Sequence, residues 1–345
     1  MKKKWVIKPR GSKDQVEALS KQLNIHPILA NLLVQRGHAT FDKAKEFFRP
    51  ELTMLHDPFL MKDMDKAIAR IDSAIGQKEK ILIYGDYDVD GTTAVALVYT
   101  FLKKRYPLVD FYIPDRYKEG YGISNKGIDW AEKEGITLII ALDCGIKSID
   151  KIEYAKSKKI DFIICDHHRP GLELPEAVAV LDPKRPDCNY PFDELSGCGV
   201  GFKLIQAYSL QHKIDTSELI EYLDLVAISI AADIVPIVGE NRILTYFGLK
   251  RLNSKPRPGI KAILDLSGNN RELTVNDVVF TIAPRINAAG RIESGKQAVE
   301  LLISESQDEA MSHGEEINKK NTTRKNLNET ITREAMLLIE QDEEF

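Results

Sequence analysis

Short apolar runs alternate with amphipathic segments through the middle of the chain, from about residue 61 to residue 181. Such alternation is typical of a parallel sheet whose strands are connected by helical crossovers. The apolar runs predict strands at 80–84, 109–113, 137–142, 161–165 and 177–181. The intervening segments have apolar residues at helical spacing. They predict helices at 64–75, 93–104, 124–134 and 148–158.

Helical patterns flank this region on both sides. Short amphipathic segments before it predict a small helical lead-in over residues 1–58, and segments at 202–209 and 218–234 after it are expected to be helices. The tail from about residue 310 has no proline, many charges and apolar residues at helical spacing, which predicts a long, weakly buried helix. The expected fold is therefore α/β, with a mainly parallel five-stranded sheet and flanking helices, followed by helical segments and a long C-terminal connecting helix. The lead-in segments are 16–23, 28–35 and 41–48.

Polar residues follow each of the five predicted strands. The carboxyl ends of parallel strands lie along one edge of a sheet, where ligands bind. We therefore expect these side chains to converge in space, although about 100 positions separate the first from the last. In chain order they are Asp86, Asp88 and Asp90; Asp115 and Arg116; Asp143; Asp166, His167 and His168; and Asp182.

The first of these groups places three carboxylates at alternate positions, Asp86, Asp88 and Asp90. Like charges this close repel one another and raise their pKa values unless a cation intervenes. A hard divalent metal would remove that repulsion. The alternative is a solvated acidic turn, with Asp90 and Gly91 as ordinary turn residues.

Three further sequence patterns suit the binding of an anion, a metal or a phosphate. Each of them also has a purely structural explanation. The small residues of 195–201 allow backbone N–H groups to approach an anion at a helix N-terminus, but they also suit a tight turn with helix-packing glycines. Asp233 follows a long apolar run and needs a metal or an arginine partner if it is buried. Arg285 and Arg291 suit bidentate phosphate contacts, or structural pairing with carboxylates.

Composition restricts the class of protein, but it says less about the chemistry. The 345 residues are 43% hydrophobic and 29% charged with a net charge of −4, so the chain can bury a sizeable core and has no global basic field. Any phosphate-binding surface must be local. The four cysteines lack metal-ligand spacing, which indicates reduced thiols in a cytoplasmic protein. The N-terminus has no apolar segment of signal length, and the longest apolar stretch is interrupted by charges and a proline, so no membrane association is expected.

Seven motifs in this order resemble those of the DHH phosphoesterase superfamily, and within it a family of single-strand-specific DNA exonucleases. The resemblance extends from about residue 80 to residue 292. It implies hydrolysis from a 5′ end of single-stranded DNA, with release of nucleoside 5′-monophosphates, in DNA recombination and repair. The motifs are 85–91, 113–122, 143–145, 166–168, 196–201, 232–236 and 287–291.

The resemblance also implies two adjacent divalent metal ions, with Mn²⁺ preferred and Mg²⁺ also accepted. Asp143 would bridge the two ions. Some superfamily members have a histidine at the position of Tyr84, so we infer that Asp86 substitutes for it as a metal ligand. By motif position, one ion would be held by Asp90, Asp143, His167 and Asp233, and the other by Asp88 and Asp143.

Substrate contacts follow from the same motifs. His168 would contact the scissile phosphate and Arg291 another phosphate oxygen, while Arg116 and Tyr121 would bind the terminal 5′-phosphate and its nucleotide. Asp143, His168 and Arg291 are thus the expected catalytic residues. Ser196, Gly197 and Gly199 are also expected to bind substrate. Stacking on Tyr117 or Tyr121 would hold bases without reading sequence. The alternative is that both tyrosines are core or rim residues.

The resemblance also predicts domains and partners. We expect a helical lead-in at 1–58, a DHH catalytic domain at 59–308 and the start of a connecting helix at 309–345, with the second domain and the oligonucleotide-binding fold absent. The expected partner is single-stranded DNA with a 5′ end, a helicase and a single-strand-binding protein are candidate partners, and the chain is expected to be a monomer. The alternatives are a phosphodiesterase for a cyclic dinucleotide or a short oligonucleotide, and a non-catalytic scaffold that binds single-stranded DNA.

Overall fold

A computed structural model describes residues 4–292 and 294–341. The chain forms two compact units, Met1–Leu55 and His56–Phe345. Each unit has its own arrangement of helices and its own core. The domain limits expected at 58 and 308 stay predictions.

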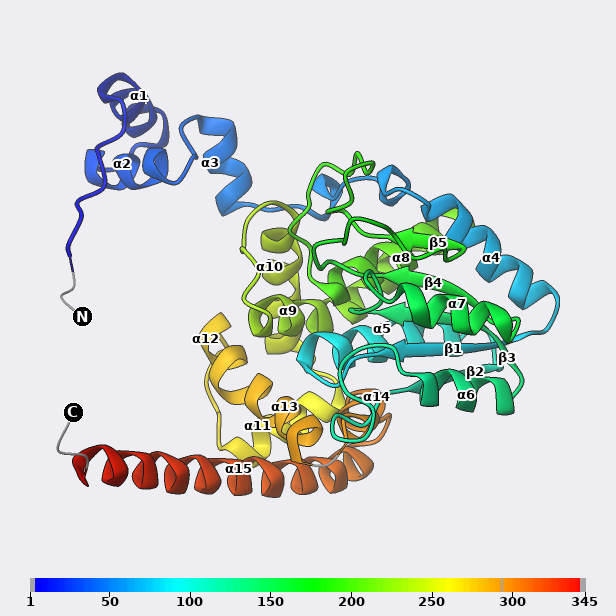
Figure 1. Cartoon of the computed structure of the whole chain (residues 1–345). Helices are drawn as coiled ribbons and strands as arrows, with labels where there is room; N and C mark the ends of the chain where they lie inside the picture. Colours follow the sequence, from blue (N-terminus) through cyan, green and yellow to red (C-terminus); the bar gives the residue numbers. More distant parts are fainter. Residues whose placement is uncertain (1–3, 293, 342–345) are drawn as a thin grey trace. The chain divides into compact units, whose positions relative to one another are not determined.

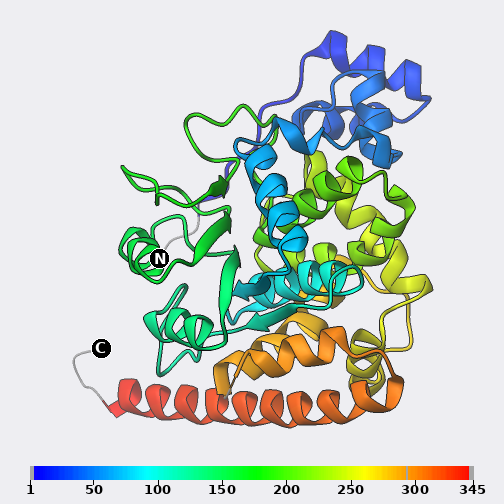
Figure 2. The ribbon, with the colours of Figure 1, turned by 90° about the vertical axis from the view of Figure 1, so that its right-hand side faces the viewer.

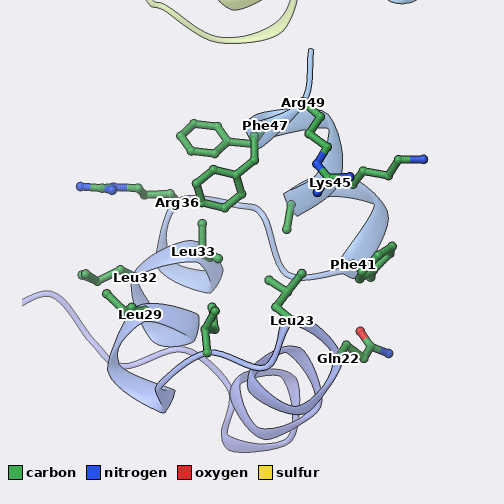
Figure 3. Close-up of a pocket in the computed structure, with 13 residues that line it drawn as sticks. Gln22, Leu23, Leu29, Leu32, Leu33, Arg36, Phe41, Lys45, Phe47 and Arg49 are labelled. Carbon is green, nitrogen blue, oxygen red and sulfur yellow. The ribbon is translucent and has the colours of Figure 1, made fainter. Parts of the chain in front are cut away.

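The first unit is a bundle of three short helices, α1 (Lys13–Leu23), α2 (Pro27–Gln35) and α3 (Phe41–Phe48). The helices bury a small core of Leu19, Ala30, Leu33 and Ala44. The Thr40 side chain accepts the backbone N–H of Lys43, so that α3 begins at a capped N-terminus. An apolar groove between the helices is edged by Arg36, Lys45 and Arg49 (Figure 3).

The second unit contains the predicted parallel sheet (Figure 1). The strand order is β2-β1-β3-β4-β5, and every neighbouring pair is parallel. The last strand is two residues shorter at its start than the apolar pattern predicts. The central strands are buried on both faces, as their continuous apolar runs indicate. The strands are β1 (Lys80–Gly85), β2 (Val109–Tyr112), β3 (Ile136–Leu142), β4 (Asp161–Cys165) and β5 (Ala179–Leu181).

Helices cover both faces of the sheet. On one face, α6 and α7 pack over a cluster that includes Leu82, Ile139 and Phe162. On the other face lie α4, α5 and α8. This is the layered arrangement expected for strands joined by helical crossovers. The helices are α4 (Met64–Gly76), α5 (Val89–Lys103), α6 (Asn125–Lys133), α7 (Ile149–Ser157) and α8 (Gly197–Gln211).

The prediction of one continuous helix over residues 218–234 is wrong. The structure has a 3-10 helix, η3 (Thr216–Tyr222), followed by α9 (Leu223–Ala232). The carboxylate of Asp224 accepts the N–H of Leu225 and binds Arg257, which favours a new helix start at this point. Helix α9 ends before Ile234, whose positive φ of 60° takes the chain out of the helix.

Helices that the sequence pattern did not predict follow α9. Helices α11, α13 and α14 pack against the first part of α15 (Figure 2). Residues 325–340 of α15 are exposed, in agreement with the expected long and weakly buried helix. Within residues 4–292 and 294–341, no helix is both long and apolar enough to cross a membrane. These helices are α10 (Gly239–Ser254), α11 (Pro258–Ser267), α12 (Val275–Asp277), the π-helical turn η4 (Val278–Ile282), α13 (Ala283–Ile292), α14 (Lys296–Ile303) and α15 (Gln307–Gln341).

Candidate metal centre

His167 and three aspartates that are far apart in the sequence meet around the imidazole of the histidine. Its Nε2 atom lies 3.2 Å from Oδ1 of Asp143, 3.6 Å from Oδ2 of Asp233 and 3.7 Å from Oδ2 of Asp90. These residues come from the ends of β3 and β4, the end of α9 and the first turn of α5. For Asp90, Asp143 and His167, the convergence expected at the carboxyl edge of the sheet is therefore present.

Several of these polar atoms are buried without a hydrogen-bond partner. Among the described residues they include both oxygens of Asp86, Oδ1 of Asp143 and both ring nitrogens of His167. Native proteins rarely leave buried polar groups unsatisfied, because desolvation is then not compensated. A divalent cation would satisfy them, and a mixed carboxylate and imidazole set suits Mn²⁺ and also accepts Mg²⁺. The donors that lie within 4.8 Å of one another form two overlapping sets, Asp90, His167 and Asp233, and Asp143, His167 and His168.

The electrostatics of the cluster point the same way. Burial, together with the charge of Asp90, raises the pKa of Asp143 well above its ordinary value. Burial and the charge of Asp88 raise the pKa of Asp86 to about 7. Burial and the charge of Asp90 raise the pKa of Asp233 to about 7 as well. Without a cation, the cluster therefore holds protons that a metal would displace.

Asp143 has an unusual backbone conformation. Its φ angle is 58°, in the left-handed region that few residues other than glycine adopt. The N–H of Asp143 donates to the carbonyl of Cys165 at 2.9 Å, which fixes this turn to the end of β4. Strain of this kind persists where the surrounding structure imposes it, and it is frequent at functional sites.

The carboxylates of the first motif lie at the start of α5. Asp88 caps the helix, because its Oδ1 accepts the N–H of Gly91 at 3.0 Å. This cap explains why α5 begins at Val89, four residues before the start that the apolar pattern predicts. Asp90 therefore lies in the first helical turn, where the helix dipole favours a negative charge.

The small residues at the start of α8 bind a carboxylate of the protein itself. The N–H groups of Gly197 and Cys198 each donate to Asp90 at 2.7 Å, and Ser229 Oγ donates to it at 2.7 Å. Ser196 Oγ accepts the N–H of Gly199 and lies 2.6 Å from Ser229 Oγ. These groups are buried and already paired, so the structure does not support the phosphate contacts expected of Ser196, Gly197 and Gly199. Their observed effect is to orient Asp90.

His168 has a partner that the sequence did not reveal. Its Nδ1 lies 2.7 Å from Oδ1 of Asp166, which is buried and also accepts the N–H of Ile146 through Oδ2. The hydrogen bond with Asp166 raises the pKa of His168. The other ring nitrogen, Nε2, lies 3.4 Å from the hydroxyl of Tyr121. Asp166 belongs to one of the sequence motifs, but only the fold shows that it orients His168.

Tyr84, at the position of the expected histidine, does not reach the metal cluster. Its ring is fully buried in the core under α6 and α7. Its oxygen accepts the N–H of Ser124 and its hydroxyl donates to the carbonyl of Gly122, both at 3.1 Å. Tyr84 therefore anchors the segment that carries Tyr121. The substitution of a ligand by Asp86 stays a prediction.

The basic and aromatic residues expected to bind substrate lie at the surface beside this cluster. The Tyr121 side chain is exposed, and the Arg116 guanidinium lies 5.2 Å from the centre of the Tyr87 ring. The Arg291 side chain is exposed, whereas its carbonyl accepts the Tyr117 hydroxyl at 2.6 Å. Arg285, by contrast, donates to the amide oxygen of Asn318 and to the carbonyl of Thr281, so the hydrogen bonds found are not the expected pairing with a carboxylate.

Comparison with known proteins identifies a matching family and several similar proteins. The DHH family, N-terminal domain, matches residues 80–230. The single-stranded-DNA-specific exonuclease RecJ of Bacillus subtilis is 44% identical over 99% of this chain and 42% of its own length. The same-named protein of Escherichia coli is 36% identical over 91% of this chain and 56% of its own length. The chain thus spans about half the length of these curated relatives.

Two solved structures are similar over most of the chain. A crystal structure of exonuclease RecJ bound to manganese matches with a TM-score of 0.75 and 30% identity, over 85% of this chain and 72% of that one. A structure of RecJ from Thermus thermophilus in complex with Mn²⁺ matches with a TM-score of 0.81 and 28% identity, over 96% of this chain and 47% of that one. The family match, the curated relatives and these two structures agree, and the chain belongs to the RecJ family of DHH proteins.

Proposed function

We propose that this chain is the catalytic part of a metal-dependent exonuclease that degrades single-stranded DNA from a 5′ end and releases nucleoside 5′-monophosphates. The observation that carries the proposal is the buried, unpartnered set of carboxylate and imidazole atoms around His167. The names of the similar proteins support the choice of substrate. The proposal also places the protein in DNA recombination and repair in the cytoplasm, with a helicase and a single-strand-binding protein as partners of a monomer.

In the proposal, Asp143 would contribute to the binding of both of two divalent cations. Asp90, His167 and Asp233 would complete one donor set, and Asp86 and Asp88 would complete the other. Two cations that share a carboxylate lower the pKa of a bound water and stabilise the attacking and leaving oxygens of an in-line displacement at phosphorus. The paired groups at the start of α8 hold Asp90 in the orientation that this requires.

The remaining side chains act on the substrate directly. His168, held by Asp166, donates a hydrogen bond to an oxygen of the scissile phosphate, where negative charge develops in the transition state. Arg291 contacts another phosphate oxygen, and Arg116 with Tyr121 binds the 5′-terminal nucleotide. Because Arg116 lies on the surface beside the cluster, its loss should mainly weaken the preference for a phosphorylated end.

Hydrolysis of three substrates in the presence of Mn²⁺ tests the proposal. The purified chain is incubated with 5′-phosphorylated single-stranded DNA, the same strand in a blunt duplex, and a cyclic dinucleotide. We expect stepwise release of mononucleotides from the single strand alone. Cleavage of the cyclic dinucleotide alone would instead support a small-phosphoester phosphodiesterase, and cleavage of none of the three would contradict a catalytic role for this chain.

The raised pKa values predict that Mn²⁺ binds more tightly as the pH rises. Asp86 and Asp233, with pKa values of about 7 in the metal-free protein, hold protons below pH 7. Each proton that the cation displaces weakens binding in that range, so we expect the apparent affinity to increase about 10- to 100-fold between pH 6 and pH 8. Titration followed by the electron paramagnetic resonance signal of free Mn²⁺ measures this change. An affinity that does not vary across this range would contradict the proposed ligands.

A further inference from the structure

Tyr87 lies between two carboxylates of the candidate metal centre and contacts both residues proposed to bind the DNA end. The guanidinium of Arg116 lies 5.2 Å from the centre of the Tyr87 ring, and the Tyr121 ring packs edge-on against it at 6.3 Å. The Tyr121 hydroxyl in turn lies 3.4 Å from Nε2 of His168. A continuous series of contacts therefore runs from Arg116 through two aromatic rings to His168.

The backbone of Tyr87 is also closely packed against two glycines. A Cβ atom at Gly290 would lie 2.4 Å from the carbonyl oxygen of Tyr87, and a Cβ atom at Gly295 would lie 3.0 Å from its Cα. The end of α13 and the residue before α14 thus approach Tyr87 as closely as backbone allows. Tyr87 is also flanked by Asp86 and Asp88, so its main chain cannot move without moving proposed metal ligands.

A further hydrogen bond joins the loop that contains Arg116 to the end of α13. The Tyr117 hydroxyl donates to the carbonyl of Arg291 at 2.6 Å, next to the glycine that packs on Tyr87. The loop with Arg116, the turn with Tyr87 and the end of α13 therefore contact one another pairwise. They join the proposed contacts for the DNA end, the metals and the scissile phosphate.

An exposed arginine that binds a phosphate loses side-chain freedom, which reduces affinity. A cation over an aromatic face is already restricted, so less freedom remains to be lost. Tyr87 supplies such a face from a fixed main chain. Because Arg116 and Tyr121 contact the same ring, that ring sets the position of both relative to the metal ligands on either side of it.

We propose that Tyr87 is a positioning residue that sets the distance between the site for the 5′-terminal nucleotide and the metal centre, and thereby fixes cleavage at one nucleotide from the end. This inference rests on the proposed exonuclease function. It assigns the spacing to the ring of Tyr87 rather than to its hydroxyl. A leucine should therefore disrupt the spacing, whereas a phenylalanine should preserve it.

The test compares Tyr87→Leu with Tyr87→Phe on three Mn²⁺-dependent substrates. These are single-stranded DNA with a 5′-phosphate, the same strand with a 5′-hydroxyl, and bis(p-nitrophenyl) phosphate, which reports on the metal centre without a DNA end. For Tyr87→Leu we expect kcat/KM on the phosphorylated strand to fall about five- to tenfold further than the rate on the small diester. The preference for the 5′-phosphate should fall by the same factor, and dinucleotides should appear among the products. Tyr87→Phe should resemble the wild type.

Each other outcome overturns a defined part of the argument. If Tyr87→Leu keeps the wild-type preference and releases only mononucleotides, or loses activity equally on all three substrates, Tyr87 does not position the DNA end. A Tyr87→Phe variant as impaired as Tyr87→Leu would assign the effect to the hydroxyl and contradict the inference. A wild-type chain that hydrolyses the small diester but releases no mononucleotide from DNA would instead overturn the proposed function, and this inference with it.

Discussion

Replacement of Asp143 by asparagine is expected to reduce Mn²⁺-dependent hydrolysis at least about a thousandfold, which corresponds to about 4 kcal/mol in the activation barrier. Asp143 is the carboxylate proposed to be shared by both cations, and its Oδ1 lies 3.2 Å from Nε2 of His167. Asparagine has nearly the same shape but binds divalent cations more weakly. Steady-state rates with saturating Mn²⁺ measure the effect.

Thermal unfolding shows whether the loss of hydrolysis in Asp143→Asn results from a destabilised fold. Asparagine adopts the left-handed conformation more easily than most residues, so it fits the φ of 58° at this position, where alanine would be strained. It also replaces a carboxyl group whose charged form is disfavoured by burial with a neutral amide, so the Tm of the metal-free variant should not fall. Added Mn²⁺ should raise the Tm of the wild type but not that of Asp143→Asn. A variant that keeps a Mn²⁺-dependent rate within tenfold of the wild type would contradict the bridging role.

Replacement of Gly197 by alanine is expected to reduce the same activity by about a hundredfold, although this substitution usually stabilises a helix by up to about 1 kcal/mol. A Cβ atom at Gly197 would lie 2.6 Å from Cβ and Oδ1 of Asp143. Either Asp143 or the start of α8 must then move, and the N–H groups that orient Asp90 move with α8. Hydrolysis rates and the Tm should both fall.

Gly76→Ala is the matched control for this variant. Gly76 is the last residue of α4, and a Cβ atom there would have no heavy atom within 4 Å. The control should leave the hydrolysis rate unchanged and should not lower the Tm. If Gly197→Ala is as active and as stable as Gly76→Ala, the close approach of α8 to Asp143 does not determine the geometry of the centre.

The parts of the fold that the sequence predicted are those in which periodicity reflects burial. The central strands of the sheet are buried on both faces, so their apolar runs were visible, and Asp161–Cys165 has the predicted limits. The start of α5 was missed because a single cap, Asp88, sets it. The helices between residues 239 and 303 were not predicted, and among them α14 packs against several helices, including α5, α13 and α15.

In the candidate centre, too, some residues could be predicted from the sequence and others could not. Asp143 and His167 could be predicted because each follows a strand, and the topology brings such residues together. The contact between Ser229 and Asp90 joins residues from separate helices, and no local pattern encodes it. At the start of α8, the sequence indicates an anion at a helix N-terminus but cannot distinguish a phosphate from a carboxylate of the protein. The structure places Asp90 there.

The most direct test of the central claim is anomalous scattering from crystals of this chain grown with MnCl₂. The claim is that two cations share Asp143. We expect two manganese peaks on either side of its carboxylate, one against Asp90, His167 and Asp233 and the other against Asp86 and Asp88. A single peak, or peaks that do not contact Asp143, would contradict the two-metal centre proposed here.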